Sequence, residues 1–188
     1  MNNSLTKKER ECRICKEPFL PFNTITPVCK AHEYEFAMQQ VEKAARKKIT
    51  AYRKEHREAK ERLKTRQDWL KDAQTAFNRW IRARDHGKPC ISCGRFHGGQ
   101  NHAGHYQSIG AHPELRFDEN NCHLQCQPCN TQLSGNLIEY RKGLIDRRGV
   151  EIVEWLEGPH EPAKYSIDDL KALKAKFKIK YLSAYLKK

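Results

Sequence analysis

The sequence has no long apolar run, and hydrophobic residues make up only 38% of its 188 positions. Its mean hydropathy is correspondingly low, at -0.90. Such a chain has little material for one large core and offers no segment that could cross a membrane. No apolar stretch follows the polar start MNNSLTKKERECR, so no secretory signal is expected. We therefore expect an intracellular protein of one or two modest domains that needs more than its core to stay folded.

Acidic residues are scarce relative to basic ones. The chain carries 36 Lys and Arg against 23 Asp and Glu, which gives a formal net charge of +13. This excess suits a polyanionic partner such as nucleic acid, although basic runs also serve solubility. The sequence also lacks a glycine-rich loop followed by lysine, so nothing in it supports nucleotide hydrolysis.

Glycine and proline are absent between Pro27 and Gly87, which predicts a long basic helical region at residues 34–86. Its middle, residues 41–71, holds 12 Lys and Arg against 5 Asp and Glu. This part would either follow DNA phosphates, remain a solvated helix, or form a homodimer through a coiled coil. The candidate phosphate contacts are Lys47, Lys48, Arg53 and Lys54.

The helical region is expected to break once. The sequence TRQD at Thr65–Asp68 matches a capping box, in which two side chains each satisfy a backbone N–H group at the start of a helix. A fresh helix should therefore begin there. Further on, Gly135, Gly149 and Gly158 delimit two short helices, and SIDD at Ser166–Asp169 caps a last one.

Eight cysteines in a polar intracellular chain indicate metal binding rather than disulfides. Two C-x2-C pairs separated by 32 residues have the spacing of zinc knuckles, whose four thiolates close a tetrahedral structural site. Cys122 is left over and is expected to be a small buried hydrophobe, or a substitute ligand if the second pair has another register. The predicted ligands are Cys90, Cys93, Cys126 and Cys129.

A second cluster near the N-terminus mixes sulfur and nitrogen ligands. It consists of a C-x2-C pair, 13 intervening residues and a C-x2-H pair. Four ligands of this kind predict a second structural zinc, which would tie together a segment too small to fold alone. The predicted ligands are Cys12, Cys15, Cys29 and His32.

The stretch between the halves of the Cys90–Cys129 site carries further polar residues. An extended segment around AGHYQ, a turn-rich loop, a second extended segment ending at Cys126 and a helix begun by QPCN would form a zinc-clamped ββα unit. This unit would present His105 and Asn130 to one spot. A neutral imidazole can take a proton from water, and an amide oxygen is a hard ligand for a magnesium-type ion. Together the two residues suit phosphodiester hydrolysis.

At these residues the sequence resembles a known family. AGHY, LRFDENN, QCQPCN and SGNLIEYRKGLIDRRG are similar to the phage NinG family, the lambda-type Rap recombination endonucleases, which belong to the wider HNH (His-Me finger) nucleases. The likeness is dense from Trp69 to Gly149 and looser at the N-terminal cluster. The resemblance implies a mainly α protein with a small zinc-clamped ββα-metal motif of the HNH type and an N-terminal zinc knuckle.

The resemblance also implies residue roles. His105 is the general base, Asn121 fixes the loop geometry, and Asn130 binds the catalytic Mg²⁺ or Mn²⁺. Many HNH nucleases have Asp directly before the catalytic His, whereas Gly104 stands here and offers no side chain. Another group must complete the site, and His102 and His123 are the two candidates.

By the same resemblance the substrate is branched DNA, such as Holliday junctions or D-loops, cleaved in the cytoplasm of a phage-infected bacterium with recombination proteins as further partners. Additional DNA contacts are predicted at Arg116, Arg141 and Lys142. Two other classes stay open: a non-catalytic zinc-stabilised DNA-binding protein and a sequence-specific HNH endonuclease. The expected organisation is an N-terminal zinc knuckle at 1–33, the basic helical region at 34–86, the nuclease domain at 87–148 and C-terminal helices at 149–188.

Overall fold

The structure, a computed structural model, describes residues 8–21, 23 and 25–186. It divides into two compact units that meet between Leu63 and Lys64. This division differs from the predicted helical region at residues 34–86, because helix α1 (Glu33–Arg62) belongs to the first unit and helix α2 (Arg66–Arg84) to the second. Residues 1–7, 22, 24, 187 and 188, which were assigned to the N-terminal knuckle and the C-terminal helices, lie outside the described residues.

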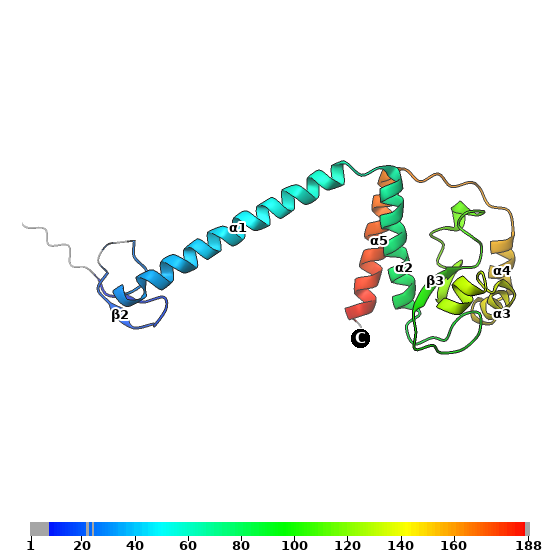
Figure 1. Ribbon diagram of the computed structural model, residues 1–188, viewed down its shortest axis with the longest axis horizontal. Helices are drawn as coiled ribbons and strands as arrows, with labels where there is room; N and C mark the ends of the chain where they lie inside the picture. The colour runs from blue at the N-terminus through cyan, green and yellow to red at the C-terminus, as the bar shows by residue number, and fades with distance from the viewer. Residues whose placement is uncertain (1–7, 22, 24, 187–188) are drawn as a thin grey trace, which may run out of the picture. The chain divides into compact units, whose positions relative to one another are not determined.

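The first unit is a small hairpin followed by one long helix. The short strands β1 (Arg10–Glu11) and β2 (Pro18–Phe19) pair antiparallel, and the 3-10 turn η1 (Lys30–His32) leads directly into α1 (Figure 1). None of the 30 residues of α1 is buried. The helix therefore has no packing partner among the described residues of its unit beyond its first turn.

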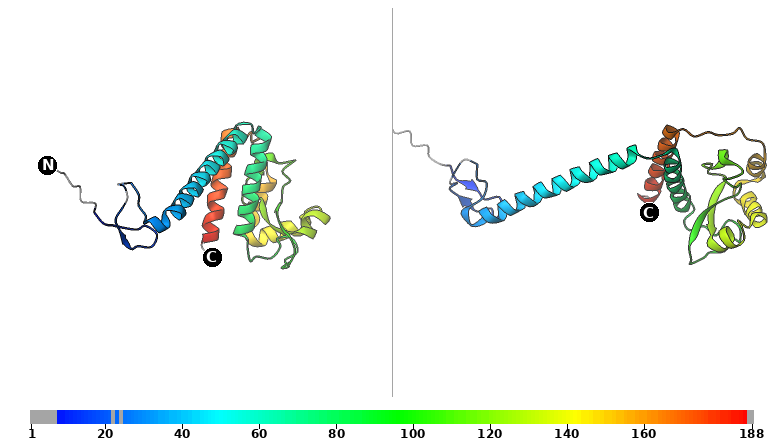
Figure 2. Two further views of the ribbon diagram at one scale, coloured as in Figure 1. Left: turned by 60° about the vertical axis from the view of Figure 1, so that its left-hand side comes forward. Right: turned by 45° about the horizontal axis from the view of Figure 1, so that its top comes forward.

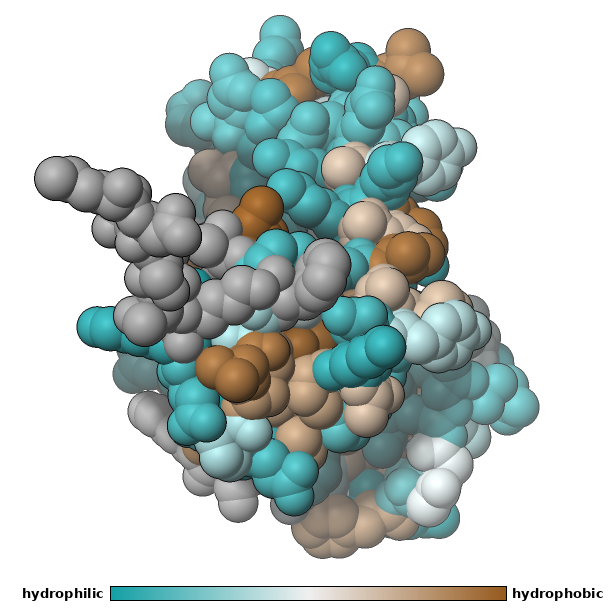
Figure 3. All heavy atoms as spheres, turned by 90° about the vertical axis from the view of Figure 1, so that its left-hand side faces the viewer, coloured by the Kyte–Doolittle hydropathy of each residue, from teal (hydrophilic) through white to brown (hydrophobic). Residues whose placement is uncertain are grey.

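Apolar side chains on α1 remain exposed. They include Tyr34, Met38, Val41, Ile49 and Tyr52. On the face drawn in Figure 3, apolar residues form only small groups among hydrophilic ones. Within the described parts of the chain, no helix combines the length and apolar composition that crossing a bilayer requires.

Two long helices organise the second unit. The predicted capping boxes are confirmed: at the start of α2, Asp68 N–H donates to the Thr65 hydroxyl at 3.2 Å and the Asp68 carboxylate accepts from Thr65 N–H at 3.0 Å. Ser166 and Asp169 make the same pair of bonds at the start of α5 (Ile167–Leu186). Helices α2 and α5 lie side by side (Figures 1 and 2), with the rings of Phe77 and Phe177 4.8 Å apart.

A two-stranded antiparallel sheet lies next to α2. Strands β3 (Asn101–His105) and β4 (Cys122–Cys126) pair so that His102 faces Gln125, Gly104 faces His123 and His105 faces Cys122. One side of this hairpin contributes Ala103 and Cys122 to the core around Phe77. Helix α3 (Leu137–Arg148) lies on the other side, where the Tyr140 hydroxyl donates to the Gly104 carbonyl at 2.8 Å. Helix α4 (Val150–Glu157) packs on α3.

The segment after the hairpin differs from the prediction. Residues Pro128–Gln132 form a single π-helical turn, and the regular helix α3 begins only at Leu137. Ser134, Gly135 and Asn136 all have positive φ, which ends the turn because a right-handed helix cannot continue through such residues. The hairpin and its zinc ligands are therefore present, whereas the ββα motif of the HNH type stays a prediction.

Candidate functional site

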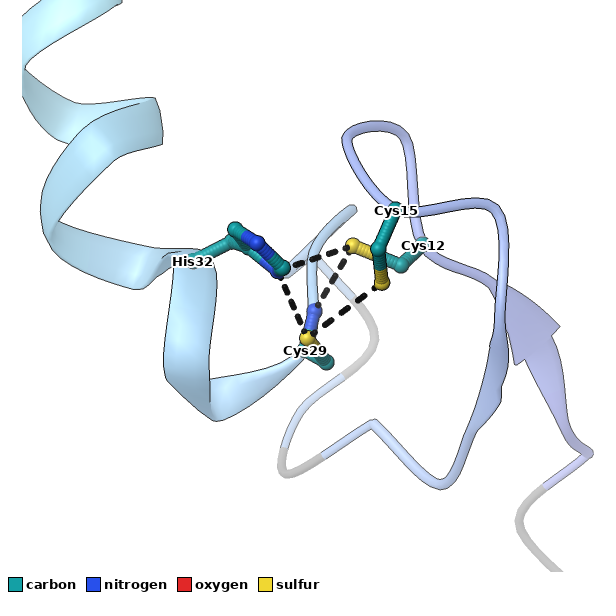
Figure 4. Close-up of side chains that lie close together, drawn as sticks. All are labelled: Cys12, Cys15, Cys29 and His32. Atoms are coloured by element: carbon teal, nitrogen blue, oxygen red, sulfur yellow. Dashed lines mark hydrogen bonds between the residues drawn. The ribbon is translucent and has the colours of Figure 1, made fainter.

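The structure brings together the four predicted ligands of the N-terminal cluster (Figure 4). The ligand atoms of Cys12, Cys15, Cys29 and His32 all lie within 4.8 Å of one another. Cys15 Sγ is 3.9 Å from Cys29 Sγ, close to the roughly 3.8 Å expected for two thiolates on one tetrahedral zinc. His32 reaches the cluster from the first turn leading into α1, so the cluster fixes the start of the long helix. This group could hold a zinc ion.

The thiol of Cys12 in this cluster has a lowered pKa. Burial by itself would raise the pKa of Cys12, but the backbone groups of Cys29, Cys15 and Ile14 hydrogen-bond its sulfur and lower the pKa to about 6. Because zinc binds the thiolate form, such a sulfur presents a ready ligand at neutral pH.

The second cluster also has the predicted members. The sulfur atoms of Cys90, Cys93, Cys126 and Cys129 lie within 4.8 Å of one another, and three of the four residues are buried. Cys90 and Cys93 come from the loop before β3, Cys126 ends β4, and Cys129 lies in the π-helical turn. A zinc ion could therefore clamp that loop and turn to the hairpin.

Cys122 takes no part in either cluster. It is fully buried in the core around Phe77, and burial raises the pKa of its thiol. The thiol therefore stays protonated, as predicted for a small buried hydrophobe. Its sulfur lies 3.7 Å from His105 Nδ1 across the hairpin.

His105 has a fixed protonation pattern. Its Nε2 lies 3.0 Å from the backbone carbonyl oxygen of Arg116, which can only accept a hydrogen bond, so Nε2 carries the proton and Nδ1 does not. Burial lowers the pKa of His105, while the Arg116 carbonyl opposes this shift. The ring is therefore neutral near pH 7, and its unprotonated Nδ1 accepts a weak hydrogen bond from the Cys122 thiol at 3.7 Å.

Asn121 holds the loop between the strands. It is fully buried, its Oδ1 accepts from Gln107 N–H at 2.7 Å, and its Nδ2 donates to the carbonyl oxygens of Gln107 and Leu115 at 3.0 and 3.2 Å. These bonds join the beginning and the end of the loop that also carries Arg116. Asn121 thus keeps in place the carbonyl that orients His105.

The structure places Asn130 beside His102 and Gly104. Asn130 Nδ2 donates to His102 Nδ1 at 2.8 Å, and Asn130 Oδ1 lies 3.1 Å from the point where a Cβ atom of residue 104 would stand. Neighbouring residues of a strand point to opposite faces, so His105 leaves β3 on the other side. Among the described residues, no hydrogen bond joins His105 to Asn130. The two side chains that were expected at one spot therefore lie on opposite sides of β3, near Gly104 and His105.

Sequence reasoning did not identify Gln125. It is fully buried on β4, its Nε2 donates to Ser92 Oγ at 2.7 Å and to the Gly135 carbonyl at 2.5 Å, and its Oε1 has no hydrogen-bond partner among the described residues. Gln125 lies two residues beyond His123, on the same face of β4. A search for amide ligands on that face would have found it.

His123 was predicted as a candidate metal ligand, but in the structure both of its ring nitrogens have protein partners. Nε2 donates to the Asn120 carbonyl at 3.0 Å, and Nδ1 accepts from the Arg84 guanidinium at 3.1 Å. The guanidinium also binds the buried carboxylate of Asp85, which accepts from Leu124 N–H at 3.1 Å. This network, which the sequence did not reveal, ties the end of α2 to β4.

The cations predicted to contact DNA differ in whether they already interact with other residues of the protein. Arg141 and Lys142 lie 2.8 Å from carboxylate oxygens of Glu157 and Glu139. Arg116 is partly buried, with Nη1 3.3 Å from Gln74 Oε1. On α1 the cations are exposed, and among the described residues only one of the four has an ion pair, Lys54 with Glu58 at 3.9 Å. The α1 set is Lys47, Lys48, Arg53 and Lys54.

Comparison with known proteins identifies the relatives of this chain. The family model described as Bacteriophage Lambda NinG protein matches residues 4–186. Protein ninG of Escherichia phage 933W is 41% identical over 183 residues, which cover 91% of each chain. Protein ninG of Escherichia phage lambda is 48% identical over 118 residues, covering 63% of this chain and 58% of its own. No solved structure matches the chain. A family match along nearly the whole sequence establishes that the chain belongs to the bacteriophage lambda NinG family, as its motifs predicted.

Proposed function

We propose that this protein is a metal-dependent, structure-selective DNA endonuclease of the HNH type that cleaves branched recombination intermediates. The observation that carries the proposal is the neutral His105, whose unprotonated Nδ1 lies at the end of β3, directly after Gly104 and its neighbouring amide oxygens. Phosphodiester hydrolysis requires a general base and hard oxygen ligands for a metal ion, and both kinds of group lie near the end of β3.

His105 would act as the general base. Its Nδ1 would accept a proton from the water that attacks phosphorus in place of the weak hydrogen bond from the Cys122 thiol, and the Nε2–H bond to the Arg116 carbonyl orients the ring. Asn130, from the π-helical turn, lies on the side of β3 toward which position 104 points, whereas His105 points to the opposite side. One phosphodiester can therefore contact both only along the strand edge at Gly104 and His105. The proposal thus defines where the scissile phosphate binds.

The side chains beside Gly104 fit a magnesium-type ion. Asn130 supplies a hard amide oxygen, and a second buried oxygen on that side lacks a hydrogen-bond partner among the described residues. A bound Mg²⁺ or Mn²⁺ would supply stabilisation of the negative charge on the departing 3′ oxygen. His102 orients Asn130 through the bond to its Nδ2. The zinc ions would be structural, because four protein ligands at each site leave no open position.

Positive charge would bring the substrate to this site. The chain has a net charge of +13, and the exposed cations of α1 are available for phosphates. Branched substrates, recombination-protein partners, a homodimer through α1 and action in the bacterial cytoplasm are parts of the same proposal, which rests on the resemblance to lambda-type recombination endonucleases.

The direct test uses purified, zinc-loaded protein with a four-way DNA junction and a linear duplex of matched sequence. We expect Mg²⁺-dependent nicking of the junction, much slower cutting of the duplex, and complete inhibition by EDTA under conditions in which both zinc ions remain bound. Zinc is measured in the same samples, so loss of fold is not mistaken for loss of the catalytic ion.

The other results would identify a different function. Binding to both DNAs without any cutting indicates a zinc-stabilised DNA-binding protein. Cutting of the linear duplex at one defined sequence, with no preference for the junction, indicates a sequence-specific endonuclease.

A further inference from the structure

A buried amide oxygen beside Gly104 has no partner among the described residues. Gln125 is fully buried, and its Nε2 donates to the Gly135 carbonyl at 2.5 Å. A carbonyl oxygen cannot donate, so exchanging the nitrogen and oxygen of the Gln125 amide would lose this bond. The Gln125 Oε1 must therefore remain on the opposite side, where no described residue satisfies it. A buried oxygen without a hydrogen bond is costly and calls for a ligand.

The unpartnered oxygen occupies the side-chain space that Gly104 leaves open. A Cβ atom at residue 104 would stand 2.0 Å from Gln125 Oε1 and 3.1 Å from Asn130 Oδ1. The two oxygens thus face the same point from different elements, Gln125 from β4 and Asn130 from the π-helical turn. Gly104 permits this arrangement because any larger residue would displace the Gln125 amide.

We propose that Gln125 Oε1 is the second protein ligand of the catalytic Mg²⁺ or Mn²⁺, beside Asn130 Oδ1, and that it replaces the carboxylate that Gly104 cannot supply. The inference rests on the proposed nuclease function. His102 is then a positioning residue, because its Nδ1 accepts from Asn130 Nδ2 and has no free lone pair for a metal ion.

The donor chemistry has a consequence for metal affinity. Amide oxygens suit hard cations, but both are neutral, whereas magnesium sites usually contain one or two carboxylates together with substrate phosphates. A site made of two amides therefore leaves the ion's charge to be balanced by the DNA phosphate. We expect Mn²⁺ to bind weakly to the free protein and more tightly once a junction is bound.

The test measures Mn²⁺ binding by the loss of the free-ion EPR signal, with and without a junction, in zinc-loaded protein. Gln125→Ala should weaken Mn²⁺ binding at least tenfold, because removal of even a supporting partner of a metal ligand typically costs about 10–100-fold. Gln127→Ala is the matched control: this exposed glutamine lies two residues away and should leave the affinity unchanged. Zinc content and junction binding in low salt report whether each variant is folded.

One further variant keeps the Gln125 side chain, and another combines its removal with a new carboxylate at residue 104. Gly104→Ala places a methyl group where Oε1 now lies; only the end of a flexible side chain must move, so the fold should persist while Mn²⁺ affinity falls. Gly104→Asp combined with Gln125→Ala supplies a carboxylate from β3 to the same space. This double variant should bind Mn²⁺ more tightly than Gln125→Ala and regain part of its cleavage.

Wild-type affinity for Mn²⁺ in folded Gln125→Ala and Gly104→Ala would overturn the assignment of Gln125, even if the wild-type protein cuts junctions. If Gln125→Ala loses zinc, the Gly104→Ala result decides alone. A wild-type protein that neither binds Mn²⁺ in the junction complex nor cleaves would instead refute the nuclease proposal itself.

Discussion

At the scale of single residues, His105 makes the pH dependence of cleavage predictable. Burial lowers the pKa of His105 below its ordinary value of 6.5, so a lower pH is needed to protonate the base. The amide ligands do not titrate. At saturating Mg²⁺, we expect the single-turnover cleavage rate to fall with decreasing pH only below pH 6.5, where His105 becomes protonated. A rate that already falls at a pH above 6.5 would mean that another group is the base.

The same pKa shift affects stability in a defined direction. The unfolded chain takes up a proton on His105 near pH 6.5, whereas the folded chain does so only at lower pH. The folded state therefore loses stability as the pH falls below about 6.5. Rates should be compared only over the range in which zinc content and junction binding are unchanged.

Residue roles differ in how far the sequence predicts them. The eight candidate zinc ligands were found because C-x2-C and C-x2-H spacing is a local property of a knuckle. Gln125 and Asp85 were missed because their roles depend on partners from other parts of the chain. His123 has the residue type of a metal ligand, and only the contacts to Arg84 and Asn120 show that its nitrogens are in use.

At the scale of elements, local signals predicted where helices begin but not how they pack. The capping boxes at Thr65 and Ser166 act within one turn, so the sequence alone locates them. The pairing of α2 with α5 joins segments far apart in the sequence, which no local pattern reveals. The π-helical turn at Pro128–Gln132 was predicted as a regular helix, because the positive φ values at Ser134 and Asn136 are not encoded by residue type.

One element-scale prediction concerns the close approach of α3 to the zinc-binding loop. A Cβ atom at Gly143 would stand 1.9 Å from the backbone oxygen of Ile91, which lies between Cys90 and Cys93. Alanine should favour the helix by about 1 kcal/mol, but the collision should outweigh this gain. We expect Gly143→Ala to lower the free energy of unfolding by about 1–3 kcal/mol, measured by denaturant unfolding in excess zinc.

Gly110→Ala is the control for this prediction. A Cβ atom at Gly110 meets nothing within 4 Å, so stability should change by less than about 0.5 kcal/mol. Equal effects of the two substitutions would show that α3 does not pack against the loop backbone.

At the scale of the whole molecule, two units with separate zinc clusters should lose metal independently. We expect about two zinc ions per chain, following four ligands per structural site. Cys29→Ser should remove one ion while the second unit stays folded, because its core and its cysteine cluster lie within residues 64–188. Cys93→Ser should remove the other ion and unfold the hairpin region. Elemental analysis combined with limited proteolysis measures both effects.

Cys122→Ala is the matched control, because Cys122 belongs to neither cluster and should leave both ions bound. Finding no zinc in carefully reduced wild-type protein would contradict the two-site architecture.

Whole-molecule charge should control DNA affinity through α1. Neutralising Lys47, Lys48, Arg53 and Lys54 should weaken binding to every DNA and lower the slope of log K against log salt by roughly 0.9 for each phosphate that the helix no longer neutralises. Arg141 and Lys142 already pair with carboxylates, so their neutralisation should have a smaller effect per charge. An unchanged salt slope in the α1 variant would identify α1 as a solvated helix or an interface between copies of the chain.

The central claim is that a neutral His105 is the base of a DNA-cleaving site, and single-turnover cleavage of a four-way junction tests it most directly. His105→Ala should keep zinc content and junction binding while cleavage falls by roughly 10²–10⁴, the usual contribution of a positioned base. His86→Ala, a change of an exposed histidine just after α2, should cut at the wild-type rate. Cleavage by folded His105→Ala at the wild-type rate would contradict the account.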